Sequence, residues 1–401
     1  MRKINVTFVS NYINHHQIPF CESMCCLLEE RGGSFTFIQT EPMEEERVKM
    51  GWSEEKGLLY VRRFYEEEEY CKRLIRESEV VLFGGCDDET YIEERLKNGM
   101  PVVRISERLY KTGQWKAISP RGLIKKYHDH TRYRRAPVFL LCAGGYVASD
   151  YHIVRAYPGK MYKWGYFPRT ELYDVDRLIE GKGYGELPYI LWAGRLIDWK
   201  HAELALETAE YLQNKNIAFH MDIIGGGDME AGLREMLDRK GLSGSVKMAG
   251  FKTPGEVRRY MERADIFLFT SDRQEGWGAV LNEAMNSACA VVADHMIGAV
   301  PYLIRNEHNG IIYRDGDKQQ LFKETERLVM EPGLRRELGE NAYRTITEVW
   351  NPQNAAKRLL ELLDGLLGDS GGQCGENYED TYPCAPERAI SEKRMYGRLI
   401  K

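Results

Sequence analysis

The amino-acid sequence predicts an α/β protein built from two doubly wound parallel sheets. Short β-rich apolar runs alternate with helical patterns in the first part of the chain, and a second alternation of the same kind begins near residue 188. Strands that alternate with helices are typical of parallel sheets covered on both faces. The 401 residues and 43% apolar content are enough for two or three domains, at ~100–200 residues per domain, each with its own core.

The first half begins directly with a βα unit. Residues 4–9 form a β-rich run, a polar loop follows over residues 10–17, and Pro19 suits the first turn of a helix over residues 20–30. Further strands are expected at residues 34–39, 80–83, 101–105 and 138–142. We interpret the acidic runs at residues 44–46 and 66–69 as solvated helix faces or loop rather than as sites.

The second half repeats this alternation. Strands are expected at residues 189–193, 218–224, 245–248 and 265–269, and helices at residues 202–213, 231–240 and 254–263. The predicted organisation is a Rossmann-like domain over residues 1–168, a linker over 169–187, a second Rossmann-like domain over 188–350, an amphipathic helix over 351–367 and a polar tail over 368–401. The tail is too polar to fold alone, so we expect it to be either docked or disordered.

Composition indicates a cytoplasmic protein. No run approaches the ~20 apolar residues of a membrane span, and the first thirty residues do not have the pattern of a signal peptide. The chain has nine cysteines, of which Cys25 and Cys26 are adjacent and several lie inside apolar runs. This usage is typical of buried thiols in a reducing compartment.

The segment EGWGAVLNE, from Glu275 to Glu283, is the principal candidate site. It follows an apolar run of strand length, residues 266–269, and Gly276 and Gly278 lead into a helical pattern that would place Glu283 about two turns into the helix. Free N–H groups of a helix start can bind an anion or a sugar, while both acids accept hydroxyl hydrogen bonds. The alternative is that Glu275 favours the helix dipole and that Glu283 is an ordinary solvated residue.

Two cations follow the first strand of the second half. Arg195 and Lys200 belong to the segment GRLIDWK at residues 194–200, at the carboxyl end of a strand, where doubly wound folds bind ligands. Arg can clamp two phosphate oxygens and Lys can act as a point charge, although both could be plain surface charges. The next strand runs into GGGD at residues 225–228, which does not meet the dinucleotide fingerprint G-x-G-x-x-G.

Together these segments resemble the donor-binding region of retaining glycosyltransferases of the GT-B fold, specifically glycosyltransferase family 4. The matching motifs are the strand that ends near Ser271, E-G-W-G at residues 275–278, E-A-M at 283–285, G-R-L-x-x-x-K at 194–200 and the glycine run after residue 224. The resemblance is dense over residues 189–317, whereas the first half matches only as architecture. It implies a GT-B fold, with two Rossmann-like doubly wound domains that face a central cleft and a last helix that crosses back to the first domain.

The resemblance also implies roles for the matching residues. Arg195 and Lys200 would hold the donor diphosphate, Glu275 the donor-sugar hydroxyls, and Glu283 the ribose. The expected catalytic residues are Glu275, Arg195 and Lys200, and the expected donor-binding residues are Gly194, Gly225, Gly226, Gly227, Phe251, Gly276, Trp277, Gly278 and Glu283. The family needs no metal for catalysis, so we expect no metal and no cofactor, with a nucleotide diphosphate sugar as substrate.

The acceptor side is predicted from the first half. Many relatives carry a glycine-rich first loop, whereas this chain has Asn14, His15 and His16 in that loop. Adjacent histidine side chains are expected to diverge, and no third ligand is evident, so a binding loop or a helix start is favoured over a metal site. Glu107, which follows a first-half strand, and His128 are further candidates near the acceptor hydroxyl.

Two other charged segments need an interpretation. Asp87 and Asp88 precede a helical run and are interpreted as capping acids rather than metal ligands. Residues 121–135 are strongly basic in a protein of net charge −5. They could be a solvated helix face, or they could contact anionic lipid headgroups or a phosphorylated acceptor. Nucleic acid is not expected as a partner, because no recognised nucleic-acid module accompanies them.

The resemblance therefore implies a retaining, metal-independent hexosyltransferase. It would move a sugar from a UDP-sugar or GDP-sugar to a glycan or lipid-linked acceptor in surface polysaccharide or glycolipid synthesis. The enzyme would be cytoplasmic, with peripheral contact at the inner membrane face through residues 121–135. The alternatives are a GT-B nucleotide-sugar hydrolase or epimerase and a non-catalytic nucleotide-sugar-binding protein. Intact Arg195, Lys200, Glu275 and Glu283 argue against decay, and the failed fingerprint argues against a dehydrogenase.

Overall fold

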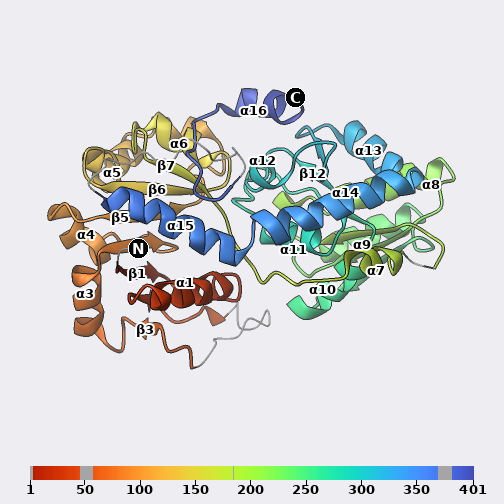
Figure 1. Cartoon of the computed structure of the whole chain (residues 1–401). Coiled ribbons are helices and arrows are strands. Elements are labelled where there is room, and N and C mark those ends of the chain that lie inside the picture. The colour runs from red at the N-terminus through yellow and green to blue at the C-terminus, as the bar shows by residue number, and fades with distance from the viewer. Residues whose placement is uncertain (1–2, 46–56, 184, 369–381) are drawn as a thin grey trace. The chain divides into compact units, whose positions relative to one another are not determined.

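The computed structural model describes residues 3–45, 57–183, 185–368 and 382–401, which form two compact units (Figure 1). The first unit contains Met1–Arg169 and Trp350–Ser391, and the second contains Thr170–Val349 and Glu392–Lys401. Each unit has one parallel sheet, and among the described residues helices lie between most successive strands. This confirms the fold class that the alternating pattern predicted.

The sheet of the first unit has the strand order β3-β2-β1-β4-β5-β6-β7 over the residues described, and all neighbouring strands are parallel. Its strands are β1 (Asn5–Ser10), β2 (Ser34–Gln39), β3 (Val61–Arg63), β4 (Val80–Gly84), β5 (Val102–Ser106), β6 (Val138–Ala143) and β7 (Met161–Trp164). The chain adds strands to one side of β1 up to β3 and then to the other side from β4 on, which is the Rossmann topology. β4 is buried along its whole length, as expected for an inner strand covered on both faces.

The helices of the first unit surround this sheet. They are α1 (Ile18–Glu30), α3 (Glu68–Glu77), α4 (Thr90–Lys97), α5 (Pro120–Asp129), α6 (Val147–Ile153) and α15 (Pro352–Leu367), with the 3₁₀ turns η1 (Gln114–Ile118) and η2 (Thr131–Tyr133). α15 packs against α1 and buries Leu359 and Leu360. Arg31 Nη1, just after α1, lies 2.9 Å from Asp364 Oδ2 of α15. The predicted apolar stripe of α15 is therefore a core face of this unit.

Part of the predicted polar tail completes the edge of this sheet. The N–H of Cys384 donates to the carbonyl of Lys163, the N–H of Lys163 to the carbonyl of Ala385, and the N–H of Glu387 to the carbonyl of Met161, each over 2.8 Å. These antiparallel contacts cover β7, which would otherwise present unpaired backbone groups. Residues 384–387 are thus docked on the first sheet, while residues 369–381 of the predicted tail lie outside the described part of the chain.

The second unit has the strand order β10-β9-β8-β11-β12-β13, again with parallel neighbours throughout. Its strands are β8 (Tyr189–Ala193), β9 (His220–Ile224), β10 (Val246–Gly250), β11 (Ile266–Phe269), β12 (Ala290–Asp294) and β13 (Ile311–Tyr313). Its helical segments are α7 (Val175–Glu180), η3 (Asp198–Lys200), α8 (Glu203–Asn214), α9 (Glu230–Arg239), α10 (Pro254–Arg263), α11 (Ala279–Asn286), α12 (Val300–Leu303), α13 (Lys318–Met330), α14 (Pro332–Arg344), the π-helical turn η4 (Thr345–Val349) and α16 (Glu392–Leu399).

Three elements of the structure were not predicted from the sequence. The predicted linker contains the short helix α7, whose N-cap Asp174 accepts a hydrogen bond from the N–H of Arg177. β7 occupies residues that the sequence did not identify as a strand. The last residues of the tail form α16, which buries Met395 and places the Tyr396 ring 5.1 Å from that of His295 in the second unit. No helix in the described ranges is both long enough and apolar enough to cross a membrane.

We predict that Leu359→Ala lowers the free energy of unfolding of the first unit by ~2–5 kcal/mol, because it opens a cavity in a closed core face. Leu359 is fully buried on α15, whereas Leu59 of the same unit is 88% exposed. Leu59→Ala is therefore the matched control and should change stability by no more than ~0.5 kcal/mol. Denaturant unfolding of both variants makes the measurement, and equal losses would contradict the assignment of α15 to this core.

Candidate functional site

Two loops meet at the carboxyl edge of the second sheet. β8 is followed by residues 194–197 and η3, and β11 is followed by residues 270–278 and α11. β8 and β11 are neighbours in the sheet, but the chain continues from β8 to β9 on one side and from β11 to β12 on the other. This is the topological switch point, where open α/β sheets bind their ligands.

An ion pair between Lys200 and Glu275 joins the two loops. Ser271 Oγ donates over 3.1 Å to the same carboxylate oxygen, Oε2. The side chains of Lys200 and Glu275 are 12% and 11% exposed, so water and salt screen this pair less than they screen a surface pair. The structure thus brings together a cation and a carboxylate that are 75 positions apart in sequence.

Arg195 is exposed beside this pair and has no carboxylate partner among the residues described. Its Cζ lies 5.9 Å from the ring centre of Trp199, and Lys200 Nζ lies 4.7 Å from the same ring. Trp199 was not among the residues predicted from the sequence. Its position between two cations of the GRLIDWK segment was the available signal, because aromatic faces attract cations.

The GGGD segment allows the chain to pass close to the loop that carries Arg195. A Cβ at Gly225 would lie 1.8 Å from the carbonyl oxygen of Gly194, and a Cβ at Gly227 would lie 2.4 Å from that of Leu196. The N–H of Leu196 donates to the carbonyl of Gly226 over 3.0 Å. The structure therefore gives these glycines a packing role, because the close approach leaves no room for side chains.

The glycines of the EGWG segment are similarly constrained. Gly278 is the N-cap of α11 with φ +91°, and a Cβ there would fall 2.4 Å from the ring of Phe269. A Cβ at Gly298 would lie 1.6 Å from the carbonyl oxygen of Gly276, and the Gly298 N–H donates to the carbonyl of Glu275 over 3.1 Å. Sequence reasoning missed Gly298, which supports the loop from outside the motif.

Trp277 anchors the loop within the second unit. Its side chain is fully buried, and Nε1 donates to Asn282 Oδ1 over 2.9 Å. Its ring also contacts that of Tyr302 at a centroid distance of 6.2 Å. Because the ring is enclosed, Trp277 can contribute to ligand binding only through its backbone. Phe251, by contrast, is exposed and lies beside Gly226, where its ring can meet a ligand.

Glu283 lies in the second turn of α11 and is partly buried. Burial raises the pKa of its carboxyl group, and the nearby Arg258 guanidinium opposes that shift. Arg258 itself donates to the main-chain carbonyl of Glu283 over 3.3 Å and to Asn286 Oδ1 over 3.0 Å. Within the described residues the Glu283 carboxylate makes no side-chain hydrogen bond. Its carboxylate oxygens can therefore accept further hydrogen bonds.

The predicted acceptor-side loop of the first unit is a helix start. Asn14 Oδ1 accepts from the N–H of His16 over 3.0 Å, and its Nδ2 donates to Gln17 Oε1 over 3.0 Å, just before α1. The expectation that the two histidine side chains diverge was wrong, since the rings of His15 and His16 contact each other with centroids 3.9 Å apart. Burial lowers the pKa of His15.

The two other acceptor-side candidates lie in different surroundings. Glu107 follows β5, is partly buried, accepts from the Tyr166 hydroxyl over 2.6 Å and pairs with Lys111. His128 lies exposed on α5. The neighbouring His130 is instead buried, with Nδ1 2.7 Å from the Tyr157 hydroxyl, and burial lowers its pKa to about 2. His130 is therefore a neutral structural histidine.

Asp88 precedes Glu89, the N-cap of α4, and its side chain binds the first residue of the helix. Its Oδ1 accepts from the N–H and the hydroxyl of Thr90, the first residue of α4, over 2.9 and 2.7 Å. These hydrogen bonds lower the pKa of Asp88. Across the described residues no group of three or more His, Cys, Asp or Glu side chains is arranged to hold a metal ion.

Two doubly wound units, each with a parallel sheet, are the architecture of the GT-B fold. A glycosyltransferase from Rickettsia africae ESF-5 has a similar structure, with a TM-score of 0.64 at 14% identity, over 92% of this chain and 100% of that chain. Anabaena Alr3699/HepE, crystallised in complex with UDP, gives a TM-score of 0.66 at 12% identity, over 90% of this chain and 100% of that chain. At such low identity these likenesses show the fold alone.

The second unit also resembles known proteins in sequence. Residues 178–345 match the family model of glycosyl transferases group 1. The amylovoran biosynthesis glycosyltransferase AmsK of Erwinia amylovora is 32% identical over 182 residues, which is 44% of this chain and 44% of AmsK. The putative colanic acid biosynthesis glycosyltransferase WcaL of Escherichia coli K12 is 28% identical over 188 residues, 44% of this chain and 45% of WcaL. The alignments span less than half of either relative. The family-model match at residues 178–345 contains both loops.

We predict that Gly225→Ala destabilises the second unit by ~1–3 kcal/mol or more, because its Cβ would overlap the Gly194 carbonyl and force the Arg195 loop to move. Gly232→Ala is the matched control, since Gly232 lies in α9 with open space around it. That control should stabilise the unit by ~0.5–1 kcal/mol through helix propensity. Thermal unfolding separates the two variants, and equal stability would show that the close approach does not constrain the loop.

Proposed function

We propose that the chain is a retaining glycosyltransferase that moves a hexose-type sugar from a nucleotide diphosphate sugar to a glycan or lipid-linked acceptor. The observation that carries the proposal is the shielded Lys200–Glu275 pair beside the exposed cation Arg195 at the switch point. The match to glycosyl transferases group 1 over residues 178–345 supports the activity. The UDP complexes of structural neighbours support UDP as the nucleotide, and the names of AmsK and WcaL support surface polysaccharide synthesis.

Each loop residue has a proposed role in this reaction. The bond between the anomeric carbon and a diphosphate oxygen breaks, while an acceptor hydroxyl forms the new bond on the same face of the sugar. A diphosphate oxygen receives the hydroxyl proton. Arg195, Lys200 and the N–H groups at the start of α11 would stabilise the negative charge that grows on the diphosphate. Side chains of this protein then supply the positive charge, and the mechanism requires no metal.

The two acids would hold the donor. A diphosphate at Lys200 lies beside Glu275, so the sugar attached to it can donate hydroxyl hydrogen bonds to that carboxylate. Glu283 would accept from the ribose hydroxyls, and the exposed Phe251 would stack on the base. Asn14, His15, His16 and Glu107 follow strands of the first sheet, and we propose that this edge receives the acceptor.

Charge removal at the donor loops tests this assignment. We predict that Lys200→Ala weakens binding of free UDP by ~2–5 kcal/mol, because an anion loses a largely desolvated cation, and that Arg195→Ala weakens it less. Glu275→Ala should keep the fold and lose transfer. Lys215→Ala, which removes a cation from an exposed pair with Glu326 in the same unit, is the control. Titration calorimetry with UDP, and product analysis with a panel of UDP- and GDP-sugars, make the measurements.

The outcomes distinguish the proposed activity from its rivals. UDP release that depends on an added acceptor supports a transferase, whereas UDP release in water alone indicates a hydrolase. Tight UDP-sugar binding with no turnover on any acceptor indicates a binding protein. Wild-type turnover in Glu275→Ala, together with unchanged UDP affinity in Arg195→Ala and Lys200→Ala, would remove these residues from the site.

We further propose that η1 and α5 hold the protein on an anionic membrane surface. α5 buries none of its residues, and large apolar side chains are exposed on these two elements, namely Trp115, Ile118, Leu123, Ile124 and Tyr127. Cations accompany them along residues 121–135, namely Arg121, Lys125, Lys126, Arg132, Arg134 and Arg135. Exposed apolar residues interleaved with cations are typical of segments that lie in a lipid interface, whereas a plain solvated face would be polar.

We predict that the protein sediments with anionic vesicles at low salt and loses this binding as salt shortens the Debye length. Replacing Lys125, Lys126, Arg132, Arg134 and Arg135 with Gln should abolish it, at ~1 kcal/mol per basic residue, without changing UDP affinity. The matched control replaces the exposed cations of the second unit's C-terminal residues, Lys393, Arg394, Arg398 and Lys401, with Gln. If the wild-type protein does not sediment with anionic vesicles at low salt, or if both variants lose binding equally, the membrane surface is not formed by η1 and α5.

A further inference from the structure

His201 has an unusual backbone conformation beside the proposed donor site. It follows Lys200 directly, at the end of η3, with φ +52° and ψ 47° in the left-handed region. Residues other than glycine rarely adopt this backbone conformation, because their Cβ approaches the following carbonyl oxygen. Because this conformation costs free energy, the contacts of the His201 ring need an account.

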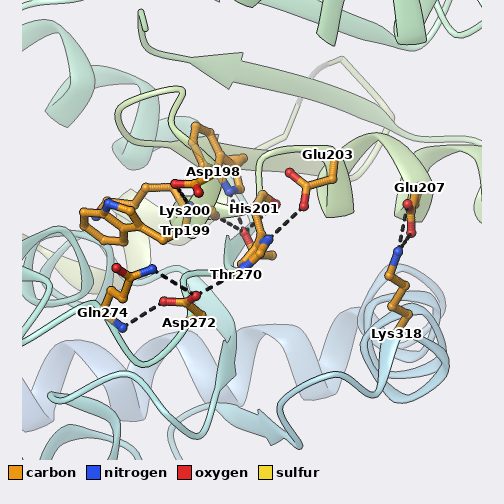
Figure 2. Close-up of polar contacts among 11 residues, drawn as sticks. Asp198, Trp199, Lys200, His201, Glu203, Glu207, Thr270, Asp272, Gln274 and Lys318 are labelled. Carbon is orange, nitrogen blue, oxygen red and sulfur yellow. Dashed lines mark hydrogen bonds and ion pairs between the residues drawn. The ribbon is translucent and has the colours of Figure 1, made fainter. Parts of the chain in front are cut away.

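The ring of His201 lies between two carboxylates from different elements (Figure 2). Nδ1 is 2.8 Å from Glu203 Oε1 at the start of α8, and Nε2 is 3.6 Å from Asp272 Oδ2 in the loop after β11. A neutral imidazole has a single N–H donor, whereas an imidazolium has two. Only the charged ring can therefore present an N–H group to both carboxylates at once.

Hydrogen bonds to backbone groups next to His201 also join the Lys200 loop to the loop after β11 (Figure 2). The hydroxyl of Thr270 faces the carbonyls of Lys200 and His201 at 2.9 and 3.0 Å, and the N–H of Asp272 donates to the carbonyl of Trp199 over 3.0 Å. The N–H of Glu275 in turn donates to the carbonyl of Asp272 over 3.1 Å. Asp272 thus connects the His201 ring to the turn that carries Glu275.

The charged surroundings keep the ring protonated. The carboxylates of Asp272 and then Glu203 raise the pKa of His201 from 6.5 to about 10, against the opposing effect of burial. Burial would raise the pKa of Asp272, but hydrogen bonds from His201 and Gln274 outweigh it and lower that pKa. The other charged side chains drawn in Figure 2 are Asp198, Lys200 and the pair Glu207–Lys318, which links α8 to α13.

We propose that His201 is a positioning residue of the donor site: held between Glu203 and Asp272, it fastens the Lys200 loop to the Glu275 loop and thereby fixes Lys200 where a nucleoside diphosphate meets it. We call these three residues the His201 clasp. The proposal rests on the proposed function, because it acts through Lys200. It assigns His201 no contact with the substrate.

A double-mutant cycle with UDP tests the clasp. His201→Gly keeps a residue suited to the left-handed backbone and removes only the ring. It should raise the dissociation constant of UDP about fivefold to tenfold in the wild-type background, as measured by titration calorimetry. In the Lys200→Ala background it should change that constant less than about twofold, because the clasp acts through Lys200. Lys318→Gln, which breaks the neighbouring Glu207 pair, is the control and should leave UDP affinity unchanged.

A pH series gives a readout that simple packing would not move. Since the pKa of His201 is raised on folding, its stabilisation is complete below about pH 6.5 and is lost as pH rises through about 10. The difference in denaturant midpoint between wild type and His201→Gly should therefore narrow from pH 7 to pH 10. A difference that stays constant over this range would contradict a charged clasp.

The results separate this inference from the proposed function. Wild-type protein that binds no UDP would contradict the proposed UDP site and the clasp's role in it. Normal wild-type binding with unchanged affinity in His201→Gly would overturn the clasp alone. An equal loss of affinity in the wild-type and Lys200→Ala backgrounds would show that His201 does not act through Lys200.

Discussion

Parallel pairing of β8 with β11 holds together two loops that lie far apart in the chain. Ile190 pairs with Ile266 and Leu191 with Phe267, so the loops that follow both strands emerge side by side at the switch point. The contact between Lys200 and Glu275 follows from this pairing. Glycines after β9 and after β12 then let neighbouring backbone segments pack closely around these loops, because a Cβ at those positions would block the contact. The charged groups of the site are thus placed mainly by backbone packing.

The sequence predicted the elements whose local signals agree with their burial. β8 and α10 occupy the residues expected of them. β8 is a short continuous apolar run, and α10 begins with the capping box of Thr253 and Glu256 and with Pro254 in its first turn. α7 was missed because a six-residue helix gives too short a pattern to stand out in a polar stretch. The docking of residues 384–387 was also beyond local reasoning, because an edge strand such as β7 pairs through its backbone and leaves little mark in the partner's side chains.

Only candidate site residues with a local signal could be identified from the sequence. Charged residues at strand ends, such as Arg195, Lys200 and Glu275, could be selected because the fold determines where strand ends lie. An aromatic residue in such a loop can either face a ligand or anchor the loop, and only the contacts of Trp277 with Asn282 and Tyr302 assign it to the second role. His201 could not be selected at all, since its carboxylate partner Asp272 comes from a distant loop.

The central claim is that Arg195 and Lys200 receive the diphosphate of the donor next to Glu275. A crystal structure of the protein with UDP tests it most directly. The account predicts diphosphate oxygens within ~2.7–3.2 Å of Lys200 Nζ and of the Arg195 guanidinium, with the ribose hydroxyls on Glu283. A diphosphate bound elsewhere, with the Lys200–Glu275 pair untouched by the nucleotide, would contradict it.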